Sequence, residues 1–171
     1  MRIIVNPAAD GGRLGRNWPQ MEKILEGYGL AAPVVLSEAP WHATELAAAA
    51  VAEGVQRVVV AGGDGTVCEA AEGLYEAGGG ELAILPLGTG NDGARTLGVP
   101  MDLEKAARVA VDGSARSFDL ITIGDHAVLT AIGVGLTGDI NDRAMGIKAA
   151  KIPMLRGILV YLAAALASLF Q

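Results

Sequence analysis

The stretch "VVVAGGDGTVCEAAEGL", from Val58 to Leu74, joins three β-branched residues to a helical pattern through a glycine-rich turn around Asp64. Glycines at 62, 63 and 65 would let backbone N–H groups approach a phosphate, and the helix that begins near Thr66 would point its positive dipole end at the same anion. A carboxylate opposes a phosphate unless a cation such as Mg²⁺ lies between them. The turn alone therefore leaves two interpretations open: Asp64 caps the helix, or it serves a phosphate and metal site.

On both sides of this turn the chain alternates between strand and helix patterns. Apolar runs predict strands at residues 2–5, 32–37, 55–61 and 82–87, and apolar spacing predicts helices at 18–28, 40–54, 66–76 and 102–113. The first helix is expected to bury Trp18, Met21, Ile24, Leu25 and Tyr28. Repeated strand–helix units of about 25 residues predict a three-layer α/β fold, with a parallel sheet and helices on both of its faces.

Three glycine-dense turns follow predicted strands: "NPAADGG" at residue 6, "AGGDGT" at residue 61 and "PLGTGND" at residue 86. The carboxyl ends of parallel strands meet at one edge of a sheet, where ligands bind, so the three turns are expected to lie together. The third turn contains a formal G-x-G-x-x-G, but it follows the fourth strand, and Asp112 lies in a turn rather than at a strand end. A dinucleotide fingerprint is therefore disfavoured, and no G-K-[ST] of a P-loop is present.

Composition narrows the class of partner. The 171 residues are 51% hydrophobic and 19% charged, and the net charge of −6 with a pI near 4.8 argues against nucleic acid as the main partner. Because Cys68 is the single cysteine, an internal disulfide is excluded and a reducing cytoplasm is expected. The uncharged run 157–171 is shorter than a bilayer-spanning helix needs, so no transmembrane segment is predicted.

The pattern changes after Arg116. Two extended runs meeting at "GDHA" predict an antiparallel pair with His126 at its tip, and a polar helix or loop and an apolar helix follow. We predict a nucleotide-binding α/β domain at 1–116, and at 117–171 the beginning of a second, β-rich domain that continues in a longer protein.

The motifs "IIVNPAADGG", "GGDGT" and "PLGTGND" together resemble the diacylglycerol kinase catalytic-domain family. These are bacterial lipid kinases related to diacylglycerol, sphingosine and ceramide kinases, and more distantly to NAD kinases and phosphofructokinases. The resemblance extends to "ARTLGVP", "FDL" and "GILVYL". It implies ATP and Mg²⁺ as cofactors, with the ATP site between an α/β domain and a β-rich domain that supplies the catalytic base.

The resemblance also assigns roles to residues of this chain. The nucleotide is expected at the first turn and at Ser37, and the phosphates at the second and third turns. The implied nucleotide-binding residues are Asn6, Pro7, Ala8, Ala9, Asp10, Ser37, Gly62, Gly63, Asp64, Gly65, Thr66, Glu69, Gly88, Thr89 and Asn91. The implied metal-site acids, linked through water, are Asp64, Asp92 and Asp119.

Three residues depart from the family pattern. Ala9 and Asp10 replace a Ser-Gly pair, and Cys68 replaces an asparagine. The resemblance implies a lipid kinase that phosphorylates diacylglycerol or a related lipid alcohol at the membrane surface, in the cytoplasm or at the inner membrane face. The alternative functions are a nucleotide-binding module without kinase activity and, less favoured, an NAD kinase. The sequence leaves the oligomeric state open, with a homodimer as one alternative.

Overall fold

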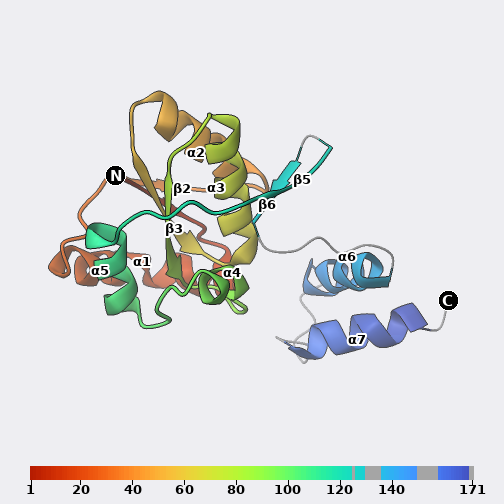
Figure 1. Cartoon of the computed structure of the whole chain (residues 1–171). Helices are drawn as coiled ribbons and strands as arrows, with labels where there is room; N and C mark the ends of the chain where they lie inside the picture. Colours follow the sequence, from red (N-terminus) through yellow and green to blue (C-terminus); the bar gives the residue numbers. More distant parts are fainter. Residues whose placement is uncertain (125, 130–135, 150–157, 170–171) are drawn as a thin grey trace. The chain divides into compact units, whose positions relative to one another are not determined.

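Four strands of the computed structural model form one parallel sheet in the order β2-β1-β3-β4 (Figure 1). The structure describes residues 1–124, 126–129, 136–149 and 158–169. The strands are β1 (Arg2–Val5), β2 (Val34–Leu36), β3 (Arg57–Gly62) and β4 (Glu81–Pro86). From β1 the chain adds β2 on one side and β3 on the other, so the order reverses between β1 and β3. In open α/β sheets a reversal of this kind opens a crevice at the carboxyl edge.

Helices cover both faces of this sheet, as the sequence predicts. The helices are α1 (Ala9–Gly27), α2 (His42–Ala52), α3 (Asp64–Glu76), α4 (Asp92–Thr96) and α5 (Leu103–Asp112). Alternate strand residues divide between two cores: Ile4 and Val58 pack with α2, α3 and α4, whereas Ile3 and Val59 pack with α1 and α5. All four residues are at most 2% exposed, which explains why the strands are apolar runs rather than alternating patterns.

Helices α2 and α3 approach closely at Gly73. A Cβ atom at this position would lie 2.1 Å from the carbonyl oxygen of Thr44, inside contact distance. Gly27 of α1, in contrast, has open space around the place where a Cβ would stand. The close contact fixes the spacing of the two helices and therefore the position of α3 beside the sheet.

The two glycines give a direct test of this packing. We expect Gly73→Ala to destabilise the fold by about 2 kcal/mol or more, because an inserted methyl group must push α2 away and this outweighs the better helix propensity of alanine. Gly27→Ala is the matched control and should be neutral or stabilising by about 0.5 kcal/mol. Urea denaturation of the two variants measures both effects, and equal stabilities would contradict the close contact.

Beyond α5 lies the predicted antiparallel pair, formed by β5 (Ile121–Ile123) and β6 (His126–Val128). The extended run at 130–135 and residue 125 of the predicted tip lie outside the described residues. The chain divides into compact units Met1–Thr130 and Ala131–Gln171, so the hairpin belongs to the first unit. The second unit contains α6 (Leu136–Ala149), where the sequence allowed a helix or a loop, and α7 (Ile158–Leu169).

The hairpin packs in the first unit, where Ala127 is buried and Leu129 belongs to the core cluster beside α2 and α3. The domain boundary at residue 116 stays a prediction. A following β-rich domain stays a prediction. In the second unit, Ala144 of α6 packs with Val160 and Ala164 of α7. Among the helices that the structure describes, none has the length and hydropathy required to cross a bilayer.

Candidate functional site

The first and second glycine-dense turns are joined across the crevice between β1 and β3. The side-chain Nδ2 of Asn6, after β1, donates to the hydroxyl of Thr66 in the first turn of α3 over 2.9 Å. The backbone N–H of Asn6 donates to the carbonyl of Ala61 over 3.0 Å. The two turns therefore form one surface where the strand order reverses, as the sequence predicts for a ligand site.

Asp64 connects the second turn to the third. Its Oδ1 accepts a hydrogen bond from the backbone N–H of Gly93, in α4, over 2.9 Å. The residue in the N-cap position of α3 is Gly63, and no side chain caps this helix end. The interpretation of Asp64 as a helix cap is therefore wrong: its carboxylate holds a neighbouring loop rather than its own helix.

Two glycines allow the second and third turns to approach at van der Waals distance. A Cβ on Gly88 would stand 2.3 Å from the Cα of Gly63, so only glycine fits there. A Cβ on Gly90 would stand 2.8 Å from Oδ2 of Asp64 and 3.5 Å from Oδ2 of Asp92. Both carboxylates thus reach the same point beside Gly90. The sequence-based site omits Gly90 and Gly93, although the glycine spacing of "GTGNDG" was the signal that could have identified them.

The third turn is shaped by Asn91, which has a left-handed backbone with φ of 56°. Its Oδ1 accepts from the N–H of Gly88 over 2.9 Å, and its Nδ2 donates to the carbonyls of Gly88 and Pro86. Asparagine tolerates this conformation better than most residues because its short side chain bonds locally. Asn91 therefore builds the loop that presents Thr89, whose side chain is exposed.

The first turn departs from regular helix immediately after Ala9. Asp10, Gly11 and Gly12 all have positive φ, at 52°, 65° and 80°. The carboxylate of Asp10 pairs with Arg13, with Nε 2.7 Å from Oδ2 and Nη2 2.8 Å from Oδ1, and this pairing raises the pKa of Arg13. The negative charge that Asp10 adds to the turn is therefore partly offset by a neighbouring guanidinium.

Three loops, a helix N-terminus and two carboxylates at one sheet edge match the parts of a nucleotide phosphate site. Residues 1–123 match the family described as "Diacylglycerol kinase catalytic domain". The chain belongs to the diacylglycerol kinase catalytic domain family. Membership of a kinase family implies ATP as the phosphate donor.

Relatives in this family are similar over part of their length. "Probable lipid kinase YegS-like" of Citrobacter koseri is 39% identical over 85 residues, which is 48% of this chain and 28% of the relative. The protein of the same name from Klebsiella pneumoniae is 35% identical over 115 residues, or 65% of this chain and 39% of the relative. A diacylglycerol kinase from Bacillus anthracis has a solved structure with 33% identity and a TM-score of 0.59, covering 70% of this chain and 44% of that one. The match therefore spans less than half the length of these relatives.

Two further residues that the resemblance implies as nucleotide-binding, Ser37 and Glu69, lie outside the three turns. Ser37 follows β2 at the same sheet edge and is 6% exposed. Its backbone N–H donates to the carbonyl oxygen of Val5 over 2.8 Å. Glu69 lies in the next turn of α3, where its Oε2 accepts from the N–H of Ala43 over 3.3 Å. The carboxylate of Glu69 thus has a partner at the start of α2, and its nucleotide-binding role stays a prediction.

Asp119 is exposed and stands two residues before β5. Within the described ranges, no three His, Cys, Asp or Glu side chains gather closely enough to hold a metal ion, so Asp119 does not join Asp64 and Asp92 in one cluster. The two carboxylates beside Gly90 still suit Mg²⁺, because this ion is commonly held by one or two carboxylates together with substrate phosphates. The metal role of all three acids stays a prediction.

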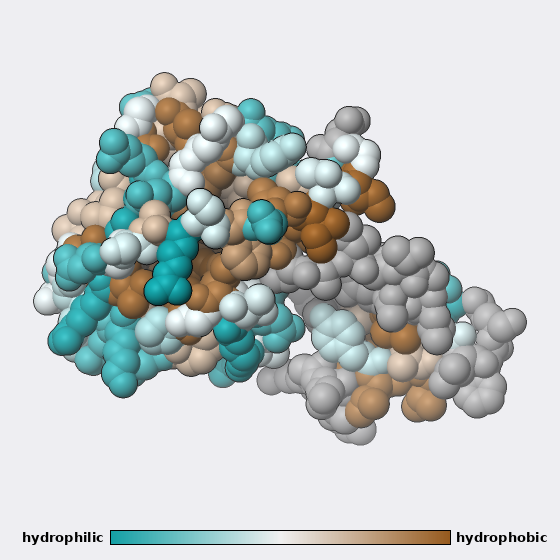
Figure 2. All heavy atoms as spheres, viewed as in Figure 1, coloured by the Kyte–Doolittle hydropathy of each residue, from teal (hydrophilic) through white to brown (hydrophobic). Residues whose placement is uncertain are grey.

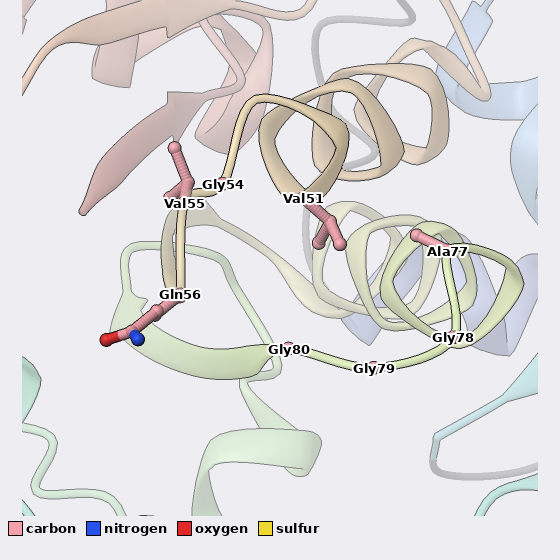
Figure 3. Close-up of a pocket in the computed structure, with 8 residues that line it drawn as sticks. All are labelled: Val51, Gly54, Val55, Gln56, Ala77, Gly78, Gly79 and Gly80. Carbon is pink, nitrogen blue, oxygen red and sulfur yellow. The ribbon is translucent and has the colours of Figure 1, made fainter.

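A separate pocket of about 380 Å³ lies at the opposite edge of the sheet (Figure 3). It is lined by the ends of α2 and α3 and by residues that precede β3 and β4: Val51, 54–56 and 77–80. These positions are at the amino ends of the strands, away from the three turns. Its lining is mostly glycine and small apolar side chains, with Gln56 as the polar group, so the carboxyl edge remains the candidate site for a kinase of this family.

Proposed function

We propose that this chain is the ATP-binding part of a kinase that transfers the γ-phosphate of ATP to the hydroxyl of diacylglycerol or a related lipid alcohol. The observation that carries the proposal is the joining of three family motifs at one sheet edge by the Asn6–Thr66 and Asp64–Gly93 hydrogen bonds. Phosphoryl transfer depends mainly on positioning and charge stabilisation, which loops of this kind supply.

In this proposal, the turn at 62–66 and Thr89 bind the ATP phosphates. The first turn, residues 6–10, and Ser37 contact the rest of the nucleotide. Asp64 and Asp92 hold Mg²⁺, which neutralises charge on the phosphates when bound, and Asp119 serves the same ion through water. The lipid hydroxyl is deprotonated by a base outside this chain, and the reaction takes place at the cytoplasmic face of a membrane.

A labelled-ATP assay tests the proposal. The protein encoded by the full reading frame is incubated with [γ-³²P]ATP, Mg²⁺ and mixed micelles that contain diacylglycerol, ceramide, a sphingoid base or monoacylglycerol. A separate reaction contains NAD as the acceptor. We expect label in one of the lipids. Label in NAD would favour the NAD kinase, and ATP binding without transfer to any acceptor would favour a non-catalytic module. Either result would overturn the lipid kinase proposal.

Asp10 stands where the family pattern has glycine, and this difference is expected to affect ATP affinity. Because Asp10 has positive φ and places a carboxylate in the nucleotide turn, Asp10→Gly should relieve backbone strain and reduce repulsion of the phosphates. We expect ATP affinity to rise about two- to fivefold, and the gain to shrink at high salt. Isothermal titration calorimetry at two salt concentrations measures this effect.

Asp10→Asn is the matched control for charge, since asparagine also tolerates the left-handed backbone. It should reproduce the affinity gain of Asp10→Gly. Asp10→Ala removes the charge too but should lower stability by about 1 kcal/mol, because alanine is strained at positive φ. Unchanged affinity in both uncharged variants would show that the Arg13 pair already cancels the charge of Asp10.

A further inference from the structure

Glu72 is a buried acid for which the proposed reaction has no use. It lies in α3, about two turns after Asp64, and is 3% exposed. Burying a carboxylate costs several kcal/mol unless hydrogen bonds replace its water. The hydrogen-bond partners of Glu72 therefore indicate its structural role.

Both partners of Glu72 belong to the start of β6. Its Oε1 lies 2.9 Å from Nδ1 of His126 and accepts from the backbone N–H of Ala127 over 3.2 Å. Trp41 stacks on the His126 ring, with centroids 5.3 Å apart and planes 28° from parallel. Trp41 has a φ of 68°, a conformation that costs energy for a bulky residue and persists only where its surroundings hold it. We call Glu72, His126 and Trp41 the hairpin anchor.

Strand β5 has little packing of its own. Its three residues, Ile121–Ile123, are all exposed, whereas Ala127 of β6 is buried. Figure 2 shows hydrophobic side chains gathered on the surface where the hairpin lies in Figure 1. A two-stranded hairpin is at best marginally stable alone, so β5 depends on β6 and β6 depends on its contacts with α3.

This dependence extends to Asp119. Ala127 pairs with Thr122, and Asp119 stands three residues before Thr122, a distance of at most about 11 Å along the chain. Between them, Leu120 packs against the hydrophobic cluster that α2, α3 and α4 share. The path of this segment is thus held at Leu120 and, through the hairpin, at Glu72.

We propose that Glu72 is a positioning residue that fixes the chain segment carrying Asp119 by anchoring the β5–β6 hairpin on α3. The inference rests on the proposed function, in which Asp119 serves Mg²⁺. Glu72 itself touches neither nucleotide nor metal in this arrangement. It acts through two hydrogen bonds and the register of one strand pair.

Hydrogen–deuterium exchange of the complete chain tests the anchor without reference to activity. Glu72→Met removes both acceptors while keeping the volume, and we expect the amides of 121–128 to exchange at least about tenfold faster. Glu72→Gln keeps a carbonyl acceptor and should restore most of the protection. His126→Phe keeps the ring on Trp41 but removes one hydrogen bond at an exposed position, so it should give an intermediate rate even if Glu72→Met folds poorly.

The second measurement isolates Asp119. Calorimetry gives the ATP affinity of the complete chain with and without Mg²⁺, and the ratio is the Mg²⁺-dependent gain. We expect Glu72→Met to reduce this gain about tenfold, as loss of outer-shell support commonly does, while Mg²⁺-free affinity stays unchanged. Asp119→Asn should have a similar effect, and the double variant should be no worse than Asp119→Asn alone.

Glu69→Met is the matched control for this cycle. Glu69 lies one turn earlier in α3 and also accepts from a backbone N–H, but it holds α2 rather than the hairpin. Its effect should add to that of Asp119→Asn. Normal hairpin protection in Glu72→Met and His126→Phe, or additivity between Glu72→Met and Asp119→Asn, would overturn the positioning role. Absence of any Mg²⁺-dependent gain in the unaltered chain would overturn the proposed function as well.

Discussion

Asp64→Asn is expected to lower ATP-dependent lipid phosphorylation by about 1000-fold. In the proposed site the Asp64 carboxylate holds Mg²⁺ against the phosphates, and loss of several kcal/mol of charge stabilisation corresponds to a factor of this size. The fold should remain, because the amide oxygen of asparagine can still accept the hydrogen bond from Gly93 that now measures 2.9 Å. Steady-state kinetics of the protein encoded by the full reading frame measure the loss of turnover, and circular dichroism shows whether the fold is retained.

The matched control is Asp112→Asn. Asp112 is an exposed acid at the end of α5 and contributes to none of the three turns. The same chemical change there should leave turnover within about twofold of the unaltered protein. If Asp64→Asn also turned over normally, the phosphate and metal assignment of "GGDGT" would be incorrect.

Arg57→Met should cost about 3 kcal/mol of stability and lower the melting temperature by about 6–12 °C. The Arg57 side chain is 18% exposed, and its Nε lies 2.6 Å from Oε2 of Glu81. Its two Nη atoms donate to the carbonyls of Ala110, Val111 and Gly113. One guanidinium thus joins β3 and β4 to the end of α5, where a cation also interacts favourably with the helix dipole. Its removal leaves carbonyls and a carboxylate without a donor.

Two further variants separate charge from geometry. Arg57→Lys keeps the charge but cannot reach all four acceptors, so an intermediate loss of about 1–2 kcal/mol is expected. Arg2→Met is the control: Arg2 has an ion pair of the same 2.6 Å length, but its partner Glu53 is 57% exposed, so about 1 kcal/mol or less should be lost. Thermal denaturation followed at 222 nm measures all three. Similar losses for Arg57→Met and Arg2→Met would contradict the proposed role of the carbonyl contacts.

The sequence predicted the four strands, the helices between them and the meeting of the three turns, because these depend on local patterns. Apolar β-branched runs bounded by glycine leave few alternatives to buried parallel strands. Periodicity was less reliable on α1, where Ile24 was placed on the buried face but is 41% exposed. Trp18 and Leu25 are buried as predicted. One position on a helix can face solvent while its neighbours are covered, since the width of the covered face depends on what packs against it.

Individual partners could not be predicted from the sequence. His126 was expected at a hairpin tip and does pair with Ile123 beside the turn, but its contact with Glu72, which is 54 residues earlier in the chain, could not be predicted. Glu69 was implied as a nucleotide contact one helix turn after the phosphate loop, which stays a prediction; that its carboxylate accepts from the N–H of Ala43 at the start of α2 could not be predicted. Motif spacing identifies which residue types stand near a turn, but the direction of a side chain depends on the helix packed beside it.

The setting of Asp64 could be predicted, because a strand end, a glycine turn and a helix N-terminus are all local features. The partner of its carboxylate depends on tertiary contacts. The N–H of Gly93 that it accepts from is 29 residues away, on the far side of a crossover and another strand. That bond forms because parallel strands bring their carboxyl ends to one edge and because Gly88 and Gly90 have no side chain to keep the loops apart.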